Sequence, residues 1–295
     1  MSLDRLAPAV FVLLWSTGWI VAKYASPHAD PLTFLSLRFT IAAVLFAVLA
    51  MVSRAAWPRT RAGWMHAVVS GVFLHGLYLG GVWWAIAQGV PSSVSGLIAA
   101  LQPLMTAIAA PYIVGERLSG PQKLGVVLGF AGLAVAILPR VLALDAAMMQ
   151  VALVPLLVNV VAMASVTSGT LYQKRHLQEG DLRAIASLQY VGGCLVVMPL
   201  ALLIEPLRID WNLEFALAMA WSVLGLSLVS IMLLLYLIRR GQVSRAASLT
   251  YLVPPAVAIE SWFLFGEELT VPMILGTVIV VIGVWLTNRK TRIIA

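Results

Sequence analysis

The sequence predicts an all-α integral membrane protein with ten transmembrane helices, arranged as an inverted repeat of two five-helix halves. The first observation is the composition: of 295 residues, 61% are hydrophobic and 11% are charged, with a mean hydropathy of +0.98. Soluble domains carry about a quarter charged residues. The second observation is a series of apolar runs long enough to cross a bilayer, and the third is an internal repeat.

The apolar runs give the expected helices. A helix needs about 20 mostly apolar residues to cross a hydrocarbon core about 30 Å thick. We expect spans at about 6–24, 32–52, 64–86, 93–113, 121–139, 148–172, 183–204, 213–238, 244–264 and 271–288. The connections are short, so we expect no extramembrane domain. The first run has a counterpart at 158–171, which a cleaved signal peptide would not have.

The internal repeat follows an ungapped shift of 151 positions. This shift pairs helix-breaking and charged residues in one register: Gly18 with Gly169, Lys23 with Lys174, Pro103 with Pro254, Glu116 with Glu267 and Gly132 with Gly283. We therefore expect two units, residues 1–144 and 145–295. Each unit holds five spans, and because five is odd, the second unit must enter the membrane in the opposite orientation.

The distribution of Lys and Arg predicts the orientation. If the N-terminus is cytoplasmic, fifteen of the 19 basic residues fall on the cytoplasmic side, three fall outside and Arg38 lies within a span. Cytoplasmic loops carry such an excess, so we expect both termini in the cytoplasm. The net charge of +7 does not indicate nucleic acid, because these residues occupy short loops instead of one basic face.

Short motifs along the chain resemble the EamA family of the drug/metabolite transporter superfamily. They are Trp15-Ser16 with Lys23 in the first span, Pro31-Leu32-Thr33-Phe34 and Arg38-Phe39 in the second, and Gly115-Glu116 and Gly266-Glu267 after the fourth and ninth. The resemblance implies an exporter of amino acids or other small metabolites in the bacterial inner membrane. It also implies a central cavity between spans 1, 3, 4, 6, 8 and 9, with spans 5 and 10 bracing the bundle.

Polar and aromatic side chains within the spans are the candidate substrate-binding residues. They are Trp15, Trp19, His75, Tyr78, Leu79, Gln102, Asn159, Met163, Ser248 and Tyr251. Hydrogen-bonding groups at membrane depth are costly and usually face the bundle interior. The alternative for each is plain packing, because helix interfaces in membranes use polar side chains as well.

Three prolines are candidate hinges. Pro103 lies midway along the fourth span, and Pro254 and Pro255 lie midway along the ninth. Proline removes a backbone hydrogen bond and bends a helix, and in lipid such a break persists where protein or a cavity satisfies the freed groups. A static kink is the alternative.

Two charged residues within spans are read as peripheral. Arg38 is expected to extend toward the outer interface and serve structure. Glu260 lies near the outer end of the ninth span, where it could pair with Arg38 or carry a proton.

The expected function is secondary transport, because inverted repeats are a recurring plan of secondary transporters with a site at the midplane. The substrate is expected to be a small metabolite, most of all an amino acid, with aromatic amino acids as one option. We expect no enzyme, no cofactor, no metal and no nucleotide motif, and partners limited to substrate and bilayer. Oligomeric state stays open, since Gly125, Gly129 and Gly132 can serve bracing or dimerisation.

The alternatives are a lipid-precursor flippase or a channel of the same fold, and an intramembrane hydrolase. The hydrolase would pair Ser95 or Ser168 with His75 or His66. An inverted duplication from end to end argues against a hydrolase, since one active site does not require it.

Overall fold

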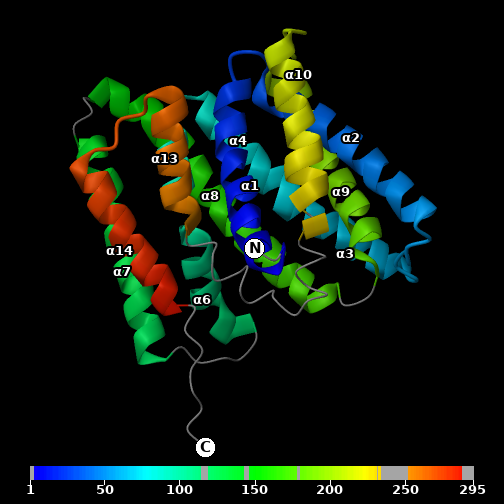
Figure 1. Ribbon diagram of the computed structural model, residues 1–295, viewed down its shortest axis with the longest axis horizontal. Helices are drawn as coiled ribbons and strands as arrows, with labels where there is room; N and C mark the ends of the chain where they lie inside the picture. Colours follow the sequence, from blue (N-terminus) through cyan, green and yellow to red (C-terminus); the bar gives the residue numbers. More distant parts are fainter. Residues whose placement is uncertain are drawn as a thin grey trace, which may run out of the picture.

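The computed structural model describes residues 3–113, 119–142, 146–177, 180–230, 232–233 and 252–287. Within these ranges the regular structure is helical, apart from an isolated bridge between Ala29 and Ile209. The helices form one bundle (Figure 1). The all-α prediction is confirmed for the described residues.

The helices of the first half begin with α1 (Leu3–Ala25) and α2 (Pro31–Val52). The third span consists of α3 (Arg61–Gly71), the π-helix η1 (Val72–Leu77) and α4 (Tyr78–Ala87). The fourth consists of α5 (Ser92–Ile98) and α6 (Leu101–Ile113), and α7 (Gly120–Leu142) follows.

The remaining described helices follow in the second half of the chain. It begins with α8 (Ala146–His176) and α9 (Leu182–Ile204), and its eighth span consists of α10 (Leu213–Ala220) and the π-helix η2 (Trp221–Val229). The described part ends with α13 (Val253–Phe265) and α14 (Val271–Thr287). Side chains of Thr60, Asp181 and Asn212 cap the N-termini of α3, α9 and α10, which explains where these helices begin.

The described residues include six helices that are long and apolar enough to cross a membrane. They are Pro31–Val52, Arg61–Ala87, Ser92–Ala109, Gly120–Pro139, Met149–His176 and Leu182–Ile204. Three shorter apolar helices are Leu213–Val229, Val253–Phe265 and Val271–Thr287. The protein is therefore a multi-pass membrane protein.

Glycines bring α7 and α14 into backbone contact at one edge of the bundle (Figure 1). A Cβ added at Gly125 would lie 2.6 Å from the carbonyl oxygen of Gly283, and one added at Gly276 would lie 2.4 Å from that of Gly132. Since low numbers in α7 meet high numbers in α14, the two helices are antiparallel. These glycines thus brace the bundle internally, as small residues do between membrane helices.

Replacing Gly276 with alanine is expected to lower the free energy of unfolding by about 2 kcal/mol, because the new methyl group would overlap backbone that cannot move aside. Thermal unfolding in detergent measures this effect. The matched control is Gly18→Ala within α1, where a Cβ meets no atom within 4 Å. Equal unfolding temperatures for the two variants would contradict the close packing of α7 on α14.

The interface of α2 with α9 crosses between the halves. Ser187 donates a hydrogen bond to the Ala43 carbonyl at 2.9 Å, and the Phe46 ring stacks on Tyr190 at a centroid distance of 5.8 Å. On another face, α9 meets α3 so closely that a Cβ at Gly71 would lie 2.0 Å from the Gln189 carbonyl oxygen. Helix α9 therefore packs directly against α2 and α3 from the first part of the chain.

The two π-helices match under the shift of 151 positions found in the sequence, because η1 shifted by that number falls within η2. A π-helical turn leaves carbonyl groups without their usual α-helical partners. Serine hydroxyls take several of them. Ser227 donates to the Ser222 carbonyl within η2, Ser230 directly after η2 donates to the Gly225 carbonyl, and Ser165 of α8 donates to the Phe73 carbonyl in η1. Both wide turns are thus held by side-chain hydrogen bonds.

The fourth span is interrupted at Ala99 and Ala100, between α5 and α6. Pro103 consequently lies in the first turn of α6, and Pro254 and Pro255 lie in the first turn of α13, positions that tolerate proline. A bend within one continuous helix was expected at Pro103. The structure instead has two helices there, because α5 ends at Ile98 and α6 begins at Leu101. The proposed hinge role of the three prolines stays a prediction.

Candidate functional site

The structure distributes the predicted site residues over several spans. Trp19, Tyr78, Asn159 and Met163 are buried, while 41% of Trp15 is exposed. Gln102 lies in α6 and Leu79 in α4, and both are half-buried. Ser248 and Tyr251 lie outside the described residues.

A buried polar cluster forms where α2, η1, α9 and η2 meet. We call Arg38, His75, Tyr190, Ser222 and Ser227 the Arg38 cluster. Arg38 is only 4% exposed, and its Nη2 donates to the Ser227 hydroxyl at 3.4 Å. Ser227 in turn donates to the Ser222 carbonyl at 3.1 Å. The cluster thus joins side chains of both halves.

Aromatic rings surround the Arg38 guanidinium. Its Cζ lies 5.8 Å from the Trp83 ring centroid and 6.0 Å from that of Phe39. The His75 ring stacks on Tyr190 at 4.4 Å with an interplanar angle of 13°. Such contacts stabilise a cation and orient an imidazole.

Three atoms of the Arg38 cluster lack hydrogen-bond partners although they are buried: Arg38 Nε, His75 Nδ1 and the Ser222 hydroxyl. Buried polar groups are almost always paired, because an unpaired one costs roughly 1–3 kcal/mol. Three unpaired polar atoms in one cluster indicate a site where a bound molecule supplies the missing hydrogen bonds.

The expected extension of Arg38 toward the outer interface was wrong, while its expected structural role is not tested. The side chain does not extend to the outer interface, because its position on α2 faces Trp83 and η2 inside the bundle. Pairing with Glu260 is also wrong, since Glu260 accepts a hydrogen bond from Ser16 at 2.7 Å. Among the described residues, the one ion pair joins Arg183 to Asp181. Arg38 therefore has no carboxylate partner there.

A second polar contact lies beside the interruption of the fourth span. Asn159 is fully buried and donates to the Ser95 hydroxyl at 2.7 Å, while its Oδ1 has no partner. Thr167, two turns along α8, donates to the Gln102 carbonyl at 3.4 Å. Asn159 and Gln102, two of the candidate substrate-binding residues, therefore lie along the contact of α8 with α5 and α6, and their role in binding stays a prediction.

On the expected outer side, the Glu267 side chain links the end of the ninth span to the start of the fourth. Its carboxylate accepts hydrogen bonds from the backbone amides of Ser92 and Ser93, at 2.9 and 3.0 Å, and from both hydroxyls. Burial raises the pKa of Glu267, but these four hydrogen bonds outweigh burial and hold the pKa below its usual value. The N-terminus of α5 thereby stabilises a charge that the C-terminus of α13 disfavours.

Glu205 makes the same kind of cap on α2. It accepts from the backbone amides of Leu32 and Thr33 and from the Thr33 hydroxyl, each at 2.8 Å. Two carboxylates of the second half therefore hold helix N-termini of the first half. Glu116, which the shift of 151 positions pairs with Glu267, lies outside the described residues.

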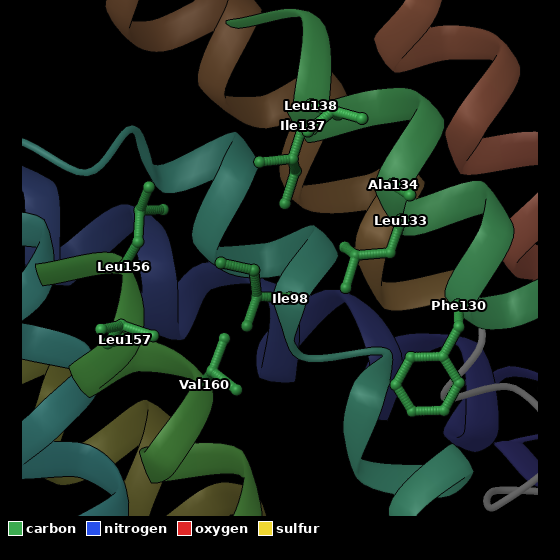
Figure 2. Close-up of a pocket in the computed structure, with 9 residues that line it drawn as sticks. All are labelled: Ile98, Phe130, Leu133, Ala134, Ile137, Leu138, Leu156, Leu157 and Val160. Atoms are coloured by element: carbon green, nitrogen blue, oxygen red, sulfur yellow. The ribbon is translucent and has the colours of Figure 1, made fainter. Parts of the chain in front are cut away.

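An apolar groove lies between α7, α8 and the end of α5 (Figure 2). Its volume is about 290 Å³, and its lining consists of Ile98, Phe130, Leu133, Ala134, Ile137, Leu138, Leu156, Leu157 and Val160. None of the predicted site residues lines it. Because it offers no hydrogen-bonding side chain, it does not suit the polar groups of a metabolite.

The catalytic pairs considered from the sequence do not form. Ser95 bonds to Asn159 and Ser168 bonds to the Ala164 carbonyl. His75 stacks on Tyr190, and His66 bonds to the Tyr172 hydroxyl at 2.6 Å. Among the described residues, no group of three or more His, Cys, Asp or Glu side chains could hold a metal ion.

Comparison with known proteins gives consistent results. A model of the EamA-like transporter family matches residues 6–138 and again residues 153–289. The chain is 23% identical to the uncharacterized transporter YvbV of Bacillus subtilis, over 96% of this chain and 91% of that protein. It is 24% identical to the probable amino-acid metabolite efflux pump of Salmonella typhimurium, over 98% and 96% of the two chains. A solved crystal structure has a similar fold, with a TM-score of 0.69 over 97% of each chain at 18% identity.

Proposed function

The chain belongs to the EamA-like transporter family, and on that premise we propose that it is a secondary transporter exporting small metabolites, foremost amino acids, across a bacterial inner membrane. Relatives over nearly the whole chain are named transporters, and two are named probable amino-acid metabolite efflux pumps. The observation that carries the proposal is the Arg38 cluster, whose unpaired polar atoms lie in the interior of a membrane-spanning bundle.

The proposed architecture is ten spans in two inverted halves, residues 1–144 and 145–295, with both termini in the cytoplasm. Four findings support it: the double match of the family, the antiparallel glycine contact of α7 with α14, the equivalent π-helices and the equivalent residues Arg38 and Gln189. Arg38 donates to Ser227 within η2, and Gln189 donates to Ser70 just before η1. Each half thus holds the π-helical span of the other through one side chain.

The proposed mechanism is alternating access around the Arg38 cluster. Because the cluster joins α2 of one half to η2 of the other, movement of one half against the other would open it. The π-helices and the interruption before Pro103 are candidate places for the movement. Trp15, Trp19, His75, Tyr78, Leu79, Gln102, Asn159, Met163, Ser248 and Tyr251 remain the proposed lining of the path, and a relation to the aromatic amino-acid exporter YddG remains a proposal.

Transport in liposomes tests the function. Purified protein should exchange radiolabelled amino acids across the membrane, with rates that saturate and that rise when unlabelled substrate is present on the opposite side. Saturation and exchange distinguish a carrier from a channel. Movement of a labelled lipid precursor with no movement of metabolites would instead favour the flippase and overturn the proposal.

A further inference from the structure

The positive charge of Arg38 has no counter-charge in the part of the bundle that the structure describes. Arg38 is the eighth residue of α2, which places it about 10 Å from the end of that helix. An arginine at such depth is costly unless an anion pairs with it. The acids that reach into the bundle or its ends have other partners: Glu260 bonds to Ser16, Glu205 to the start of α2 and Glu267 to the start of α5.

Arg38 is hydrogen-bonded to two neutral hydroxyls, those of Ser227 and Tyr190, and no anion pairs with it among the described residues. At 3.4 Å, the contact of Nη2 with Ser227 is longer than a strong charge-assisted hydrogen bond, which is about 2.7–2.9 Å. The Nε atom is buried and has no partner. A guanidinium fork with unused donors matches the planar, two-oxygen geometry of a carboxylate.

Neighbouring groups favour the same kind of ligand. The unpaired Ser222 hydroxyl and His75 Nδ1 supply further hydrogen-bonding atoms. The rings of Trp83, Phe39 and Tyr190 supply flat apolar surface beside them. A small molecule with an anionic end and an apolar body could bind the polar atoms through its anionic end and the aromatic rings through its body.

We propose that Arg38 binds the carboxylate group of the transported metabolite, with Ser222 and His75 as additional polar contacts. The inference rests on the proposed function, which assigned no residue to the carboxylate of the substrate. It implies that the transporter selects for a free carboxylate and discriminates against the corresponding amides and amines.

The experiment compares amino acids, which carry a free carboxylate, with the corresponding amino-acid amides, in which that group is uncharged. Exchange in liposomes is measured for the twenty amino acids, and each one that moves is then tested as a competitor against its amide. The wild-type protein should bind the acid about 10- to 100-fold more tightly than the amide, as expected for charge-assisted hydrogen bonds. Equal affinities would overturn the inference while leaving the proposed function intact.

Variants locate the effect at Arg38. Arg38→Met should lose the preference for the acid, and Arg38→Lys, which keeps the charge but not the fork, should retain part of it. The control Arg208→Met removes an exposed positive charge on the same side of the bundle and should keep the full preference. A purely structural role of Arg38 would lower protein yield but leave the ratio of acid to amide unchanged in the folded fraction, which would overturn the inference.

If no amino acid moves, the substrate class of the proposed function fails, and thermal unfolding decides the inference alone. Benzoate should then raise the unfolding temperature of the wild-type protein more than benzamide does, and it should not do so for Arg38→Met. No difference between benzoate and benzamide would overturn the carboxylate site.

Discussion

Replacing His75 with alanine is expected to reduce the rate of amino-acid exchange about tenfold while the protein stays folded. The His75 ring stacks on Tyr190 and lies beside Phe39, and its buried Nδ1 has no partner. Alanine removes both the stack and the unpaired nitrogen. A tenfold loss corresponds to about 1.4 kcal/mol, the size of one hydrogen bond or one aromatic pair.

His75→Phe separates the two contributions, because phenylalanine keeps a ring between Phe39 and Tyr190 but has no nitrogen. If His75 contacts the substrate, His75→Phe should transport as poorly as His75→Ala. If it serves only packing, His75→Phe should exchange at the wild-type rate. Initial rates in liposomes, normalised to protein incorporated, measure both variants, and wild-type exchange by both would remove His75 from the proposed site.

The all-helical, membrane-spanning class was predictable because membrane insertion imposes strong sequence constraints. Apolar runs must match the bilayer thickness, and the six helices that are long and apolar enough to cross a membrane overlap spans expected from that rule. Glycine spacing also carried information, since Gly125, Gly132, Gly276 and Gly283 keep their register under the shift of 151 positions. The structure places these four glycines at the contact of α7 with α14.

The Arg38 cluster was predictable only in part. His75 was identified because a histidine at membrane depth is costly. Tyr190, Ser222 and Ser227 were not, because tyrosine and serine are common in membrane spans and each is unremarkable in its own segment. Arg38 was misjudged because its distance along α2 suggested reach to the interface, whereas the face of the helix determines its environment. That face depends on packing between the halves.

The π-helices had no recognisable sequence signal. Neither Val72–Leu77 nor Trp221–Val229 contains proline, and both read as ordinary apolar helix. The contacts that hold the wide turns come from serines five residues away, or from another helix, as with Ser165 on Phe73. The prolines predicted irregular backbone in the fourth and ninth spans. Nothing in the sequence predicted it for the third and eighth spans, which contain the π-helices.

Replacing Glu267 with alanine is expected to lower the free energy of unfolding by about 4 kcal/mol at neutral pH. The carboxylate accepts from two backbone amides and two hydroxyls of Ser92 and Ser93, both of which are fully buried. Removing it leaves several buried donors unpaired, at roughly 1–3 kcal/mol each. Denaturant or thermal unfolding in detergent measures the loss, with Glu214→Ala as control because Glu214 is exposed on the same expected side.

The effect of Glu267 should depend on pH in a defined direction. Its pKa is lower in the folded protein than in the unfolded chain, so the ionised carboxylate contributes its full stabilisation above the usual glutamate pKa of about 4.3. That contribution falls as the pH drops through the lower, folded pKa. The stability difference between wild type and Glu267→Ala should therefore be constant from about pH 6 to 8 and shrink below about pH 4. A difference that instead grew on acidification would show that the protonated form makes the cap, and it would contradict the charge-assisted contact between α13 and α5.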